Sequence, residues 1–127
     1  MDCYERILSF VRRPGRYINQ EWNHYPPPPD LAQRARVCLC YPDIYELGAS
    51  SLGIEILYHL FNNQPGVYAE RVYLPEQDYI QQLQSAEVPL TSLETGTPLN
   101  QFDILGITLP HELCYTNVLK ILQLAQI

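Results

Sequence analysis

The stretch YPDIYELGASSLGIEILYHLF (41–61) decides the fold, because it joins a strand to a helix through a polar, glycine-containing loop. The segment before it, RVCLCYPD (36–43), alternates apolar side chains and is closed by a proline, which predicts a strand. The segment SSLGIEILYHLFNN (50–63) predicts a helix whose first turn Ser50 or Ser51 can cap. Its apolar residues at helical spacing are Leu52, Ile56, Leu57, Leu60 and Phe61.

The same order of strand and helix continues to the end of the chain. VYAERVYLP (67–75) predicts a second strand and EQDYIQQLQSA (76–86) a second helix. VPLTSLET (88–95) is a short extended piece, a doubtful fourth strand. FDILGITLP (102–110) is a strong strand, so apolar that we expect it to be buried on both faces. HELCYTNVLKILQLAQI (111–127) predicts a last helix, with one apolar face formed by Tyr115, Val118, Leu119, Leu122 and Ala125.

Residues 1–34 differ from this pattern. YERILSFVRR (4–13) predicts a short helix that Pro14 and Gly15 break, and NHYPPPPDLAQ (23–33) predicts a stiff connector. We therefore expect an N-terminal helix and Pro-rich connector at 1–34 and an α/β domain at 35–127. The fold class is a three-layer, Rossmann- or flavodoxin-like parallel sheet with helices on both faces.

The predicted sheet is small for this class. It has about four strands, and the last helix has neither a C-cap nor a following strand. Two readings follow: the chain is the truncated first part of something longer, or a partner completes its sheet.

Composition narrows the possible partners and the compartment. A net charge of −6 and a pI of about 4.9 argue against nucleic acid or an anionic membrane as the main partner. No apolar run reaches the length of a membrane span, and the acidic N-terminus does not fit a signal peptide. None of the four cysteines forms a CxxC pair, and Cys38 and Cys40 share one strand face, so we expect both in the core and a cytoplasmic location.

Two segments follow strands at the edge where parallel sheets bind ligands. The first, Pro42 to Gly53, places Gly48, Ala49, Ser50 and Ser51 at the start of a helix, where small residues and free N–H groups favour a phosphate. Helix capping explains the serines equally well. The second segment, Pro110 to Asn117, begins with His111, which either contacts a ligand or caps the helix. No two histidines lie close together in the sequence, so we predict no metal site.

Five ordered segments resemble the N-terminal region of a family of uncharacterised radical S-adenosylmethionine (radical SAM) proteins. They are RPGRYINQEWN, YPDIYELGASSLGIEILYHLFN, YAERVYLP, PLTSLETGTPLNQFDILGITL and ELCYTNVLKILQLAQI, which together cover nearly the whole chain. The resemblance implies a cobalamin-binding-type α/β domain placed before a radical SAM barrel. In that barrel a CxxxCxxC motif would hold a 4Fe–4S cluster that binds S-adenosylmethionine. This sequence has no such motif, so it generates no radical by itself.

The resemblance also names a cofactor site. Cobalamin domains of the best-known type carry DxHxxG after the first strand, and here that loop reads DIYELG (43–48), with Tyr45 in place of the histidine. Asp43 and Gly48 keep the spacing, whereas the cobalt ligand is missing. The expected cofactor-binding residues are Asp43, Tyr45, Gly48, Ala49, Ser50, Ser51, Gly53 and His111.

Two functions from different classes compete. In the first, the chain is a non-catalytic, cobalamin-binding-type accessory domain whose partner is a downstream radical SAM barrel. In the second, it is a small binding module that self-associates through an open sheet edge and catalyses nothing. A flavin or nucleotide module rests on fold analogy alone.

Overall fold

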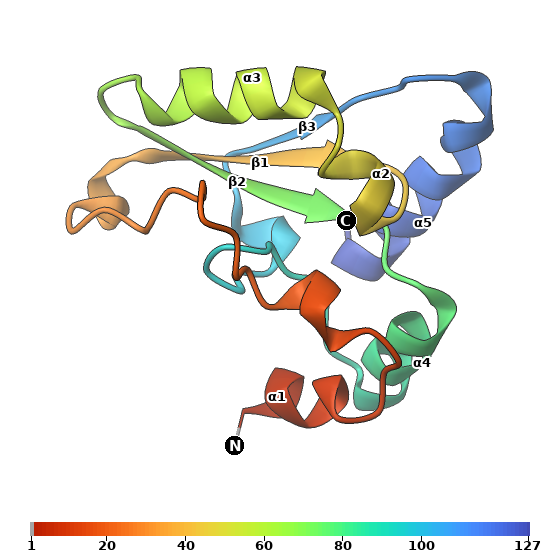
Figure 1. Ribbon diagram of the computed structural model, residues 1–127. Coiled ribbons are helices and arrows are strands. Elements are labelled where there is room, and N and C mark those ends of the chain that lie inside the picture. The colour runs from red at the N-terminus through yellow and green to blue at the C-terminus, as the bar shows by residue number, and fades with distance from the viewer. Residues whose placement is uncertain (1) are drawn as a thin grey trace.

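A computed structural model describes residues 2–127, which form a three-stranded parallel sheet with helices on both faces (Figure 1). The strands are β1 (Ala35–Tyr41), β2 (Val67–Tyr73) and β3 (Ile104–Ile107), in the order β2-β1-β3. Val37 of β1 lies opposite Ala69 on one side and Ile104 on the other. The α/β class and the parallel, incomplete sheet predicted from the sequence are confirmed.

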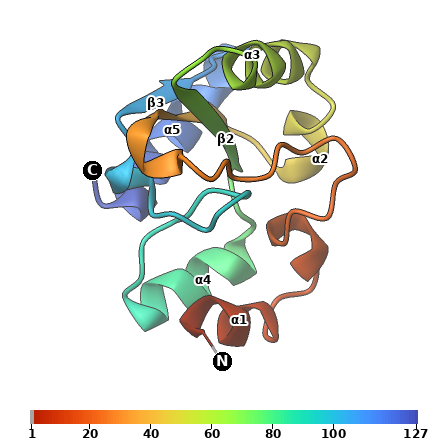
Figure 2. The same cartoon turned by 90° about the vertical axis from the view of Figure 1, so that its left-hand side faces the viewer.

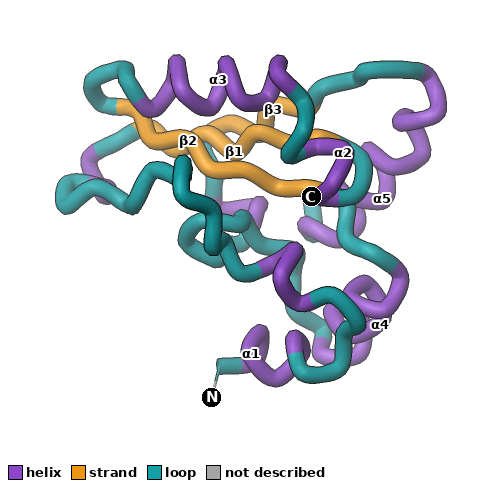
Figure 3. The backbone as a smooth tube through the Cα atoms, in the orientation of Figure 1, coloured by secondary structure: helices purple, strands orange, loops and turns teal. Residues whose placement is uncertain are grey.

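Among residues 2–127, four of the five α-helices lie where the sequence pattern predicts them, although the N-terminal one is shorter than predicted. The fifth, at Tyr45–Gly48, forms inside the segment that was expected to be a loop. The helices of the α/β part are α2 (Tyr45–Gly48), α3 (Leu52–Asn62), α4 (Gln77–Ala86) and α5 (Tyr115–Ala125), and α1 (Cys3–Leu8) precedes them. Short 3₁₀ turns occur at Pro14–Tyr17, Leu31–Gln33, Leu99–Gln101 and Glu112–Cys114. α3 lies over one face of the sheet, and α4 and α5 lie on the other side (Figures 1 and 3). No described helix has the length and apolar character needed to cross a membrane.

The doubtful fourth strand at 88–95 does not form. This segment makes a single antiparallel bridge, from Thr91 to Pro98, and its backbone serves the edge of β2 instead. The Leu93 N–H donates to Arg71 O at 2.8 Å, and the Arg71 N–H donates to the Glu94 carboxylate at 2.7 Å. The segment therefore caps a sheet edge without joining the sheet.

The core has two parts, one on each face of the sheet. The larger one contains Cys38 and Cys40, both fully buried as predicted, and buried residues of α4 and α5. Ile7 and Val11 from the N-terminal segment also belong to it, and α1 packs beside α4 (Figure 2). The smaller part joins Val37, Leu39, Ile54, Tyr58 and Ala69 beneath α3.

Three predicted apolar faces are only partly buried. On α3 the buried residues are Ile54 and Tyr58, whereas Leu52 and Leu60 of the predicted stripe are 67% and 54% exposed. On α5 Ile121, Leu124 and Ala125 are buried, and Tyr115 and Leu119 face outward. β3 is shorter than predicted and not buried on both faces, since Ile104 is 56% exposed. These side chains have the spacing of core residues, but nothing among residues 2–127 covers them.

Candidate functional site

The candidate site lies between the carboxyl ends of β1 and β3. The chain leaves β1 toward β2 on one side, while β3 pairs with β1 on the other, so the loops that follow β1 and β3 diverge there. Ligands of open parallel sheets bind at such a point.

The loop after β1 is fixed by the backbone of Asp43. The Asp43 N–H donates to Tyr41 O at 2.8 Å, and Asp43 O accepts from the Leu74 N–H at 2.9 Å, which ties the ends of β1 and β2 together. One carboxylate oxygen of Asp43 accepts from the Ile44 N–H at 2.8 Å. The other oxygen stays available at the edge of the sheet.

Tyr45 and Gly48 of α2 face away from this point and pack over the end of β2. The Tyr45 ring meets the Tyr73 ring edge-on, with centroids 5.4 Å apart, and its hydroxyl donates to Glu21. Burial, followed by the hydrogen bond and charge of Glu21, raises the pKa of Tyr45 to about 12. A Cβ at Gly48 would lie 2.2 Å from the Tyr73 ring. Both residues are therefore used in packing, and the small size of Gly48 serves the tyrosine rather than a ligand.

The start of α3 is open, and its serines do not cap it. The Ser50 hydroxyl donates to Glu46 O at 2.8 Å, and Ser51 occupies the N-cap position without a side-chain hydrogen bond to the helix. A Cβ at Gly53 would have no atom closer than 3.9 Å. The first N–H groups of α3 thus lack side-chain partners, as an anion site at a helix N-terminus requires. Ala49 is half-buried between the two helices.

The loop after β3 approaches Asp43. The Thr108 N–H donates to Cys40 O at 3.0 Å, and the Asn117 side chain donates to Pro42 O at 2.9 Å, so this loop is held to the end of β1. His111 is exposed, makes no side-chain cap, and lies with its two ring nitrogens 3.6 and 3.7 Å from the buried Cys114 Sγ. Ligand atoms of Asp43, His111 and Cys114 all lie within 4.8 Å of one another.

The structure thus divides the eight expected site residues into three groups. Asp43 and His111 meet at the switch point, Tyr45 and Gly48 pack on Tyr73, and the remaining four lie at the start of α3. Cys114 was missed, because only CxxC spacing and pairs of histidines were considered. The His-x-x-Cys spacing at 111–114 is the sequence signal that could have identified it.

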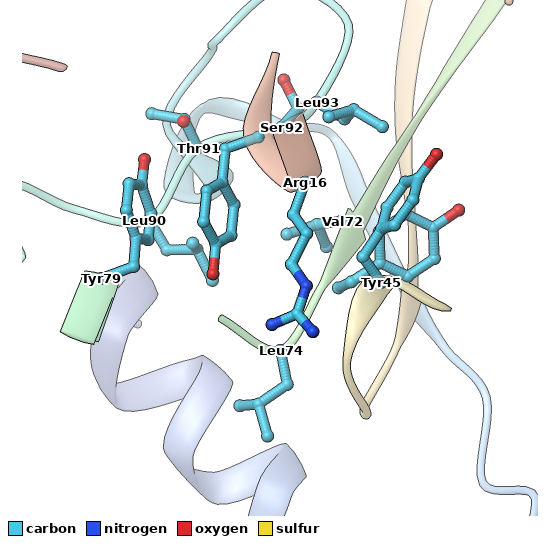
Figure 4. Close-up of a pocket in the computed structure, with 11 residues that line it drawn as sticks. Arg16, Tyr45, Val72, Leu74, Tyr79, Leu90, Thr91, Ser92 and Leu93 are labelled. Carbon is cyan, nitrogen blue, oxygen red and sulfur yellow. The ribbon is translucent and has the colours of Figure 1, made fainter. Parts of the chain in front are cut away.

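A separate pocket lies at the end of β2, between the N-terminal segment and residues 90–93 (Figure 4). Arg16 crosses it, pairing with Glu46 and Glu76 at 2.8 Å each, and Tyr17 stacks on Tyr79 beside it. Its volume of about 30 Å³ is enough for one or two water molecules but far below that of an organic cofactor. The pocket is therefore a gap between packed segments, and the switch point remains the candidate site.

A buried group of charged side chains surrounds Arg71 of β2. Arg71 pairs with Glu94 at 2.7 Å and with Glu21 at 2.6 Å, and its guanidinium lies 4.3 Å from the centre of the Tyr58 ring. Burial acts to lower the pKa of Arg71, but the surrounding charges and hydrogen bonds, led by those of Glu94, together outweigh it and the pKa is raised. An arginine that is permanently charged and paired with two carboxylates holds structure and is a poor proton donor.

Comparison with known proteins identifies the family. Residues 53–127, more than half of the chain, match the family model described as radical SAM proteins, N-terminal. The match begins in the first turn of α3 and includes β2, β3 and the His111–Cys114 loop. No curated protein and no solved structure matches the chain at a significant level. The chain therefore belongs to the family of N-terminal domains of radical SAM proteins.

Proposed function

We propose that this chain is a non-catalytic accessory domain that docks onto the downstream radical SAM part of the same protein. The observation that carries the proposal is an uncovered apolar side, formed by the outer face of α3 and by β3. Leu52, Ile56, Leu57 and Leu60 of α3 and Ile104 of β3 are between 38% and 67% exposed. Exposed large apolar side chains gathered on one side of a domain are typical of an interface.

The two edges of the sheet differ in a way that supports the same proposal. The β2 edge is protected, because the Asn62 side chain bonds both the N–H and the C=O of Ala69 at 3.0 Å and Glu94 accepts from Arg71. Among residues 2–127, no other segment bonds to the outer edge of β3. An unprotected edge beside exposed leucines suits a further strand and helix. The family description places such domains at the N-terminal side of radical SAM proteins. It therefore favours the downstream part of the protein as the source of this strand and helix.

Co-purification tests the docking. The 127-residue chain is mixed with the separately expressed downstream part, and the complex is measured by size-exclusion chromatography. Ile56→Asp with Leu60→Asp should abolish the complex, because two carboxylates would be buried in the interface. Gln81→Asp, a change at an exposed position on α4, should leave it intact. Docking that survives the double variant refutes the proposed face.

Self-association is the second candidate, and the same open β3 edge favours it. Sedimentation of the 127-residue chain separates the two. A tight dimer that the α3 double variant dissociates would assign the face to a second copy of the chain. A monomer that binds the downstream part supports docking.

For the ligand, we propose a cobalamin-type cofactor at the carboxyl edge of the sheet. The uncapped N-terminus of α3, with Ser51 and Gly53, supports this proposal because it suits the phosphate of such a cofactor. Tyr45 does not fit the role of a cobalt ligand, since its hydroxyl is bonded to Glu21. When bound, the corrinoid would supply alkyl or electron transfer, and these residues would position it.

A spectral titration of the full protein with hydroxocobalamin tests the cofactor. Gly53→Asp adds a negative charge at the helix N-terminus and should weaken binding at least about tenfold, by opposing the phosphate. Ala32→Asp, at an exposed position in the turn before β1, is the control. An unchanged cobalamin spectrum at saturating protein refutes this part of the proposal and leaves the docking proposal standing.

A further inference from the structure

The structure brings a nitrogen, a sulfur and an oxygen donor together at the switch point. His111 and Cys114 stand at the two ends of one 3₁₀ turn, in which residues three apart lie on the same side. Asp43 comes from the loop after β1, 68 residues earlier than His111 in the sequence, and its carboxylate completes the group. We propose that Asp43, His111 and Cys114 bind a single divalent transition metal ion of the Zn²⁺ type.

The observed spacing fits tetrahedral coordination. With a Zn–S bond of about 2.3 Å and a Zn–N bond of about 2.05 Å at the tetrahedral angle, the N···S edge is about 3.6 Å. The Cys114 Sγ lies 3.6 Å from Nε2 and 3.7 Å from Nδ1 of His111, so both distances match this edge, and a turn of the exposed imidazole would direct one nitrogen at the ion. The 4.8 Å limit for the group leaves about 1 Å to be closed by Asp43. Side-chain rotation can close it, because Asp43 is half-buried and His111 is exposed.

The surroundings orient the ligands as metal sites require. The Ile44 N–H bonds one oxygen of the Asp43 carboxylate, which leaves the other oxygen to bind the ion. The Cys114 N–H donates to His111 O at 3.1 Å, which fixes the two ligands relative to each other. Asn117 holds the loops together through Pro42 O. These bonds involve backbone atoms or outer oxygens, so metal binding breaks none of them.

The donor set predicts both the metal and the coordination. Thiolate and imidazole select borderline-soft ions such as Zn²⁺ over Mg²⁺ or Ca²⁺, which prefer oxygen donors only. Three protein ligands leave a fourth position open, as in zinc sites that bind water or a further ligand. Because His111 is exposed and Cys114 is buried, that open position faces the outside of the sheet edge.

Titration of the tag-free 127-residue chain with Co²⁺, under reducing and anaerobic conditions, tests the site. The expected result is one ion per chain, with intense visible bands of tetrahedral Co²⁺ and a near-ultraviolet thiolate charge-transfer band. Zn²⁺ should displace the Co²⁺. The probe is the metal alone, so the result is independent of cobalamin and of docking.

Matched variants decide whether these three residues are the ligands. Cys114→Ser should abolish the charge-transfer band, and His111→Gln and Asp43→Asn should each weaken binding at least about tenfold. Cys3→Ser and His59→Gln, an exposed cysteine and an exposed histidine elsewhere, should bind as the wild type does. His111 is exposed, so His111→Gln remains a valid test even if Cys114→Ser fails to fold.

Three results would each overturn the site: no saturable binding at one ion per chain, a charge-transfer band that survives Cys114→Ser in a folded protein, or unchanged affinity in His111→Gln. Unchanged affinity and spectrum in Asp43→Asn would overturn the three-ligand assignment.

Discussion

Replacing Gly48 by alanine separates two explanations for the glycine in the loop after β1. In the first, the glycine lets a ligand approach the backbone, and the variant folds normally but binds less well. In the second, it makes room for Tyr73, and the variant is destabilised with no ligand present. The structure supports the second, since the new Cβ would lie 2.2 and 2.3 Å from two atoms of the Tyr73 ring.

The size of the effect follows from two opposing terms. Overpacking of a filled core costs about 1–3 kcal/mol, and an overlap of more than 1 Å belongs at the upper end. The Tyr73 ring has little room to move, because it is 7% exposed and is met edge-on by Tyr45. Alanine recovers up to about 1 kcal/mol through its helix propensity. We therefore expect Gly48→Ala to lower the free energy of unfolding by about 2 kcal/mol.

Urea unfolding followed by far-ultraviolet circular dichroism measures this change. The matched control is Gly53→Ala in α3, where no atom lies within 3.9 Å of the new Cβ. That variant should be more stable than the wild type, by about 0.5–1 kcal/mol. The same chemical change should thus have opposite signs at two sites five residues apart. Gly48→Ala of equal or greater stability than the wild type would refute the packing argument and restore the ligand explanation.

Three further predictions concern the cysteines, the Arg71–Glu94 pair and the Arg16–Glu46 pair. Ellman's reagent should label the exposed Cys3 quickly, while Cys38 and Cys40 react only on unfolding, because both are fully buried and burial raises the pKa of Cys40 to about 12. Rapid labelling of more than two thiols in the native protein would contradict this. Arg71→Met should cost about 3–5 kcal/mol in urea unfolding, since it leaves the buried Glu94 carboxylate unpaired, whereas Arg34→Met, which breaks the surface pair with Asp30, should cost at most about 1 kcal/mol; equal costs would be inconsistent with a buried pair. Burial acts to raise the pKa of Glu46, but the hydrogen bond and charge of Arg16, the charge of Arg13 and a backbone hydrogen bond together outweigh it and leave the pKa below its ordinary value. The stabilisation is therefore present above the unfolded pKa of about 4.3 and is lost as the pH falls through the lower folded pKa. Wild type and Glu46→Gln should then differ most near neutral pH and converge below about pH 4, and a gap that persists at low pH would exclude the ion pair as its source.

Local sequence patterns were sufficient for the three strands and the longer helices. They were insufficient for α2, for the segment 88–95 and for the surroundings of each element. The alternation in β1 and the spacing in α3 and α4 predicted each element, because the period of the apolar residues depends only on the local backbone. The exposure of the α3 leucines and of Ile104 could not be predicted, since it depends on which segments of the chain pack against them. Arg71 shows the reverse case, in which an arginine that reads as an exposed strand residue is buried by Glu94 and Tyr58 from distant segments.

For the candidate site, the sequence pointed to the sheet edge where Asp43 and His111 meet, but it did not predict Cys114 beside them or the packing of Tyr45 on Tyr73. Parallel topology places the loops after β1 and β3 at one edge, so Asp43 and His111 were predictable from the strand pattern alone. Tyr45 faces away from that edge because its side chain contacts Glu21 and Tyr73, which lie in other segments. Cys114 was not predicted because it belongs to neither a CxxC motif nor a pair of histidines, and Asp43, the third donor, comes from a loop 68 residues before His111.

The proposed docking side and the proposed metal site are linked through the loop after β3. Leu109 and Leu113, on either side of His111, are 55% and 77% exposed, although their apolar character favours burial. A segment that covered these two leucines would also close over the exposed imidazole. It would then exclude water from the open metal position, where a low dielectric strengthens every charge interaction. The docked protein should therefore release the metal to a chelator more slowly than the 127-residue chain, and the α3 double variant, which does not dock, should release it at the rate of the isolated chain. Equal rates of metal release from the docked and the undocked wild type would show that docking does not cover the metal site.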